Sequence, residues 1–64
     1  MVLSDGTKVW LNASSILKFP LIFQGKERIV ELEGEAYFEV ARDTLHHFIV
    51  RTRNATLRVL GTSF

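Results

Sequence analysis

The stretch RIVELEGEAYFEV, residues 28–40, alternates between two kinds of side chain over almost its whole length. One set of alternate positions is apolar or glycine: Val30, Leu32, Gly34, Ala36, Phe38 and Val40. The other set holds Ile29, Glu31, Glu33, Glu35, Tyr37 and Glu39. A strand sorts such residues onto two faces, whereas a helix would scatter the glutamates around its axis. The stretch is therefore predicted to be extended, with a bulge, a bend or a break between two strands at Gly34.

Short strands are also predicted before this stretch. Asp5-Gly6 stands between Val2-Leu3 and residues 7–12, which predicts a hairpin with a type I′ turn. Within residues 8–12, Val9 and Leu11 are predicted to point to one side and Trp10 to the other. Three further elements complete this half: a turn at residues 13–15, a brief strand at residues 17–19 that Pro20 ends, and a turn at residues 24–26.

The C-terminal part continues the same pattern. A loop is predicted up to His47, then a strand at residues 48–52, a turn at residues 53–54 and a strand at residues 55–60. In the last strand Leu57 and Val59 are predicted to point inward and Arg58 outward. Together these segments predict an all-β fold of short antiparallel strands, solenoid-like or sandwich-like, that fills residues 1–64. Because Phe64 has the pattern of the first apolar residue of another strand, we expect the fold to be incomplete at the C-terminus and to continue beyond it.

Size and composition limit the possible partners. A chain of 64 residues without cysteine buries only about 60% of its unfolded surface, so an isolated fold is expected to be marginal. With open strand edges, it is expected to form a homodimer or a strand swap, which a monomer mass by light scattering would contradict. The hydrophobic content of 47% excludes a disordered tail, and a net charge of +1 does not favour nucleic acid or an anionic membrane. No apolar run approaches the length of a membrane helix.

The acidic stripe Glu31, Glu33, Glu35 and Glu39 is the most unusual chemical feature. Carboxylates on one strand face could bind calcium or act as an acid–base pair. We favour cross-strand ion pairing with arginines at outward positions of neighbouring strands, namely Arg28, Arg51, Arg53 and Arg58. His46-His47 lacks other histidines or cysteines to complete a metal site, and no serine stands in a nucleophile motif. The sequence therefore predicts no catalytic residue, no cofactor and no metal, hence no enzyme.

Four aromatic residues, Trp10, Phe19, Phe23 and Tyr37, have two interpretations. Core packing is the more common role of such residues and is favoured here. The alternative is a carbohydrate- or ligand-binding β-module, which requires Trp10, Phe19 and Tyr37 to be exposed on one concave face.

The order of the segments resembles that of a known family. The matching residues are Asp5-Gly6-Thr7, Val9-Trp10-Leu11-Asn12, Leu17, Phe19-Pro20, Phe23, Gly25, Arg28, Val30, Leu32, Gly34 to Val40, Phe48, Val50, Thr52 and Val59 to Phe64. They resemble the FecR family, specifically the N-terminal half of its periplasmic region, and Trp10-Leu11-Asn12 resembles the form common in gut Bacteroidetes. His47 departs from the proline usual in the family, which puts the conformation of that loop in question.

The resemblance implies a signalling role without catalysis or cofactor. FecR proteins are single-pass inner-membrane anti-sigma regulators whose periplasmic part is contacted by an outer-membrane TonB-dependent transducer. Their cytoplasmic segment, outside these residues, then changes its hold on an extracytoplasmic-function sigma factor. For this chain, charge density predicts that the partner-binding face contains Glu31, Glu33, Glu35, Arg51 and Arg53.

Overall fold

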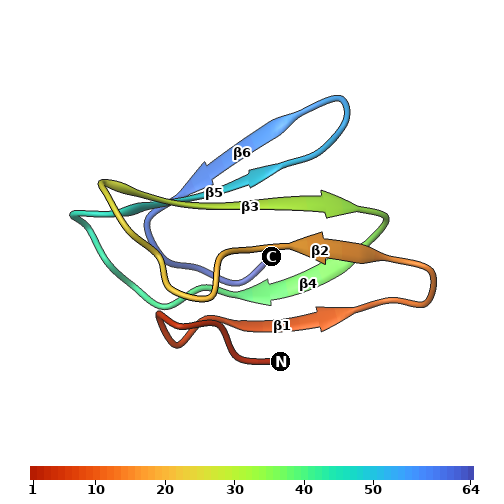
Figure 1. Ribbon diagram of the computed structural model, residues 1–64, viewed down its shortest axis with the longest axis horizontal. Coiled ribbons are helices and arrows are strands. Elements are labelled where there is room, and N and C mark those ends of the chain that lie inside the picture. The colour runs from red at the N-terminus through yellow and green to blue at the C-terminus, as the bar shows by residue number, and fades with distance from the viewer.

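The computed structural model describes all 64 residues and consists of strands and connecting segments (Figure 1). The strands are β1 (Lys8–Leu11), β2 (Ile16–Lys18), β3 (Glu27–Glu33), β4 (Ala36–Glu39), β5 (His47–Arg51) and β6 (Thr56–Val59). They form two sheets, a smaller one in which β1 pairs with β4 and a larger one with the order β2-β3-β5-β6. The all-β prediction is therefore confirmed. There is no helix of the length and apolarity needed to cross a membrane.

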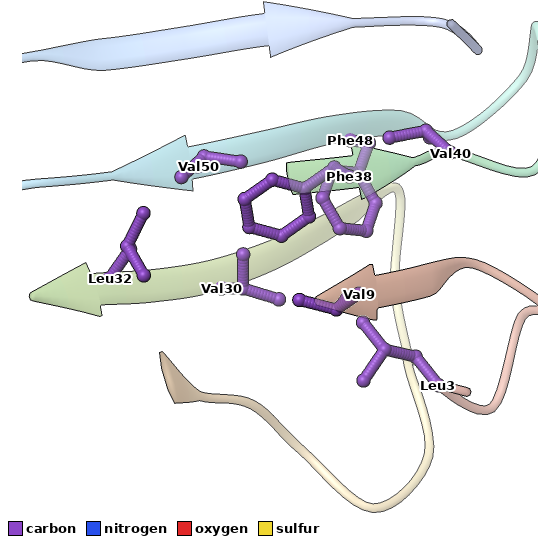
Figure 2. Packing of buried hydrophobic residues seen from close by; sticks show 8 residues of the cluster. All are labelled: Leu3, Val9, Val30, Leu32, Phe38, Val40, Phe48 and Val50. Atoms are coloured by element: carbon purple, nitrogen blue, oxygen red, sulfur yellow. The ribbon is translucent and has the colours of Figure 1, made fainter. Parts of the chain in front are cut away.

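The hydrophobic core lies between the inner faces of the two sheets (Figure 2). The smaller sheet contributes Val9 and Phe38, and the larger sheet contributes Val30, Leu32, Phe48 and Val50, with Leu3 and Val40 at the margin. The rings of Phe38 and Phe48 meet edge to face, with centroids 6.0 Å apart. The alternation predicted for residues 28–40 is confirmed, because its apolar set faces this core while its glutamates at 31, 33, 35 and 39 are exposed.

Gly34 separates the long alternating stretch into β3 and β4, which belong to different sheets. Its φ of +97° is a conformation that glycine adopts without steric cost. Because β4 leaves the larger sheet, the chain must cross back before β5, and β5 then runs parallel to β3. The other three strand pairs are antiparallel. The expectation of antiparallel strands is therefore wrong for this central pair.

The first hairpin has a different turn from the predicted type I′. Such a turn needs positive φ at both central residues, but of Asp5 and Gly6 only Gly6, at +89°, has it. The N–H of Gly6 donates to the carbonyl of Leu3 (3.0 Å), and the N–H of Leu3 donates to the carbonyl of Thr7 (2.8 Å). This pattern is a three-residue loop with glycine in the left-handed position. The Asp5 carboxylate accepts hydrogen bonds from the Thr7 N–H and Oγ1, which hold the loop closed.

The two ends of the chain extend the smaller sheet. The N–H of Val9 donates to the carbonyl of Met1, so the first residues lie beside β1. Phe38 and Phe64 exchange backbone hydrogen bonds of 2.7 and 2.9 Å, so the last residues lie beside β4.

β6 is an edge strand of the larger sheet that pairs only with β5 and diverges from the other strands in Figure 1. Val59 packs against the core as predicted. Leu57 points to the same face as predicted, because it lies opposite the buried Val50 in the β5–β6 register, but its side chain is 46% exposed. The reason is that the smaller sheet is narrower and leaves the distant end of β6 uncovered.

Candidate functional site

A charged hollow of about 380 Å³ lies on the larger sheet. It is lined by Ile16, Lys18, Glu31, Leu32, Glu33, Arg51, Thr52 and Arg53. The strand register builds it, because Lys18 on β2 lies opposite Glu31 on β3, which lies opposite Arg51 on β5. A second hollow of about 280 Å³ shares Glu33 and Arg53 and reaches Asn54 in the β5–β6 turn. The charged hollow thus alternates positive and negative side chains across three strands.

Four of the five residues predicted for partner binding line this hollow, namely Glu31, Glu33, Arg51 and Arg53. Glu35 does not. It follows the Gly34 turn, its N–H donates to the Ser15 hydroxyl (2.9 Å), and its carboxylate accepts from the Asn12 amide (3.3 Å). The strand break therefore moves Glu35 to the smaller sheet, away from the hollow.

The predicted ion pairing of the acidic stripe is not found. None of the glutamates at 31, 33, 35 and 39 forms an ion pair. The one glutamate ion pair is Glu27 with Arg58, at 3.7 Å between exposed side chains. The carboxylates of Glu31 and Glu33 in the charged hollow are therefore exposed and form no ion pair within the chain.

Arg28 was predicted to point outward but is buried, with 3% of its surface exposed. Its Nη1 donates to Asp5 Oδ2 (2.7 Å) and to the Ala41 carbonyl (2.8 Å). Nε donates to the His46 carbonyl (2.9 Å), and Nη2 donates to the Leu60 carbonyl (3.2 Å). One side chain thus joins β3 to the first hairpin, the segment after β4, the residue before β5 and the residue after β6. The sequence contained a signal for this burial, because residue 28 belongs to the same set of alternate positions as the inward-facing residues 30 and 32.

A smaller polar cluster occupies the β4–β5 connection. His46 Nδ1 lies 2.8 Å from Asp43 Oδ2, and the Leu45 N–H donates to Asp43 Oδ1 (2.9 Å). The Leu45 hydrogen bond, followed by that of the His46 ring, lowers the pKa of the Asp43 carboxyl below its ordinary value of 3.8. No group of three or more acidic, histidine or cysteine side chains is arranged to hold a metal ion.

The aromatic residues divide between core and surface. Phe23 packs against the core, its ring 6.1 Å from that of Phe48. Trp10, Phe19 and Tyr37 are 50%, 39% and 47% exposed, so their predicted core role is wrong. Trp10 and Tyr37 face each other across β1 and β4 with ring centroids 5.6 Å apart. Phe19 follows β2 of the other sheet, and no hollow includes any of the three, so the concave aromatic face of a ligand-binding module is not formed.

These features define an all-β module with an open, charged surface suited to binding. The comparisons with known proteins identify its family. Residues 1–64 match the FecR protein family over the whole chain, and the chain belongs to this family. No curated protein matches it.

Two solved structures are similar to the whole chain. Both are crystal structures of a "putative anti-sigma factor" from Parabacteroides distasonis ATCC 8503, at 1.65 and 2.50 Å resolution. Each is 52% identical to this chain, with a TM-score of 0.98 over all of its residues. This chain spans 30% of the length of those chains.

Proposed function

We propose that residues 1–64 are part of the periplasmic domain of an anti-sigma regulator and act in signal relay, without catalysis and without a cofactor. The observation that carries this proposal is the match to FecR over the full chain, together with the similarity to a solved "putative anti-sigma factor". The chain belongs to the periplasmic portion of a single-pass inner-membrane protein. It receives a signal from an outer-membrane TonB-dependent transducer and passes it to an extracytoplasmic-function sigma factor, which the cytoplasmic segment of the protein binds.

The charged hollow is the proposed contact surface for the transducer. Glu31, Glu33, Arg51 and Arg53 line it, and its glutamates lack ion-pair partners in the chain. Alternating charges favour a partner with the complementary order of charges and disfavour others, because like charges brought together are costly. Glu35, which lies on the other sheet, is proposed to contribute only if the partner reaches around the Gly34 turn.

Crosslinking in the native cell envelope tests the proposal. A photo-reactive residue in place of Lys18, at the edge of the charged hollow, is expected to crosslink the whole protein to a TonB-dependent transducer. The same residue in place of Lys26, which is exposed in the turn before β3, is the control and is expected to give a much weaker crosslink.

Charge reversal then tests the individual side chains. Glu31→Lys with Glu33→Lys is expected to abolish the Lys18-site crosslink and to uncouple sigma-dependent transcription from the transported nutrient. Lys26→Glu should leave both unchanged. Recovery of no transducer from any site, with the protein folded and inserted, would refute the relay function. If a transducer is recovered but its crosslink persists in the double charge-reversal variant, only the assignment of the charged hollow as the contact surface is refuted.

A further inference from the structure

The outer face of the smaller sheet carries an aromatic pair that the relay proposal does not use. On this face, here called the aromatic face, β1 presents Lys8 and Trp10, β4 presents Tyr37 and Glu39, and the next cross-strand pair is Asn12 with Glu35. Figure 1 shows β1 and β4 side by side, on the opposite side of β2 and β3 from β6. Half of the Trp10 surface and nearly half of the Tyr37 surface is exposed.

The two rings are suited to anchor a protein partner. Trp and Tyr are enriched among the residues that dominate the energy of protein interfaces. Trp10 and Tyr37 contact each other at 5.6 Å between centroids, so each ring already restrains the other before any partner binds. Less side-chain freedom is then lost on binding, which favours affinity.

The shape of the aromatic face favours a macromolecule over a small ligand. Sites for small molecules are concave and enclose most of the ligand. None of the four hollows of the structure includes Trp10 or Tyr37. A flat sheet face is instead covered by another surface or by an extended chain.

The charges around the rings favour a cationic partner. Glu39 on β4 and Glu35, directly before β4, lie two residues to either side of Tyr37, and Lys8 lies opposite Glu39 in the register. The Glu35 carboxylate has only the neutral amide of Asn12 as its hydrogen-bond partner. The faces of Trp and Tyr rings are themselves electronegative, and a cation above them is stabilised. Arginine suits such a site best, because its planar guanidinium stacks on a ring while donating to a carboxylate.

We propose that the aromatic face is a second interaction surface, and that it binds a protein segment presenting arginine side chains to Trp10, Tyr37 and Glu35. This surface is separate from the charged hollow and does not depend on the identity of the transducer. It extends the relay module from one contact surface to two, on opposite sheets.

Within residues 1–64, whose folding in isolation is first confirmed by far-ultraviolet circular dichroism, Trp10 is the only tryptophan, so its fluorescence reports on this face. The probe is a capped Gly-Arg repeat peptide, titrated at low salt, with Gly-Glu and Gly-Ser repeats of equal length for comparison. The Gly-Arg peptide is expected to change Trp10 emission saturably, and the other two are not. Glu35→Gln with Glu39→Gln is expected to weaken binding by about threefold to tenfold, the scale of an exposed cation–π or charge contact.

The matched control is Glu31→Gln with Glu33→Gln, which removes the same charge from the other sheet and is expected to leave the Trp10 titration unchanged. No saturable change up to millimolar Gly-Arg peptide would overturn the proposal, as would an equal response to the Gly-Glu peptide. A response to a neutral oligosaccharide such as cellohexaose, without one to Gly-Arg, would overturn it in favour of a glycan surface. An equal loss of affinity for the Gly-Arg peptide in the two glutamine variants would overturn the proposal, because the peptide would then bind through overall charge rather than at this face.

Discussion

Replacing Arg28 by methionine is expected to remove most of the stability of this domain. Methionine fills similar space but leaves the Asp5 carboxylate without its partner at 2.7 Å, and Asp5 has only 14% of its side chain exposed. Removing one member of a buried ion pair costs about 3–5 kcal/mol. Three backbone carbonyls, those of Ala41, His46 and Leu60, also lose their donor. A domain of this length has a total free energy of unfolding of roughly 3–10 kcal/mol, so the variant is expected to be partly or wholly unfolded.

Urea denaturation followed by far-ultraviolet circular dichroism measures this loss. Arg28→Lys keeps the charge but not the planar set of five donors. Its free energy of unfolding is expected to lie between those of the wild type and Arg28→Met. Arg58→Met removes an exposed arginine whose partner, Glu27, is 3.7 Å away, and a change within about 0.5 kcal/mol is expected. If Arg28→Met cost no more than Arg58→Met, Arg28 would not be the residue that joins these segments.

A double-mutant cycle separates the charge from the geometry. Asp5→Asn alone leaves the Arg28 guanidinium buried without its counter-charge, so it is expected to be destabilising. Asp5→Asn combined with Arg28→Met is expected to cost less than the sum of the two single changes, because neither charge is then left uncompensated. Additive losses would contradict a direct coupling between the two side chains.

Two further expectations concern the turns. Gly34→Ala is expected to cost about 1–3 kcal/mol, since an alanine would be strained at φ +97° and its Cβ would approach the Ser15 backbone to 3.0 Å. Gly25→Ala, at φ +83° with no atom near the added Cβ, introduces only backbone strain, so it should lower the free energy of unfolding by less. An equal loss would contradict the steric clash with Ser15 as the reason for the larger effect at Gly34. The hydrogen bonds to Asp43 lower the pKa of its carboxyl. Their contribution to the stability of the folded state is therefore fully present above pH 3.8, the ordinary pKa, and is lost as the pH falls through the lower pKa of the folded state. The amide resonance of Leu45 should therefore shift at a pH below 3.8, and Asp43→Asn should abolish that shift; a shift at or above 3.8 would contradict the assignment.

Much of the architecture followed from local pattern. The alternation in residues 28–40 correctly predicted which side chains are buried, and Gly34 was recognised as a position where the strand is interrupted. The family was also recognised from the order of short motifs along the chain. These are properties of neighbouring residues, because an extended chain places successive side chains on opposite faces whatever it packs against.

The candidate surfaces depended on packing that local pattern does not encode. Glu35 belongs to the same alternating series as Glu31 and Glu33, yet the turn at Gly34 places it on the other sheet. Trp10 and Tyr37 are apolar enough for a core, but they lie on the outer face of a sheet that nothing in the chain covers.

The sequence by itself thus determined the strand content, the face of nearly every side chain in the long stretch, and the family. Only the tertiary structure decided that β5 runs parallel to β3, that Arg28 is surrounded by carbonyls from three later segments, and that the charged and aromatic surfaces lie on different sheets. The physical reason is the range of the interactions. Side-chain alternation is set within a few residues, whereas the hydrogen bonds that bury Arg28 join it to residues 13 to 32 positions away, and the β3–β5 pairing joins strands that are separated by β4 in the sequence.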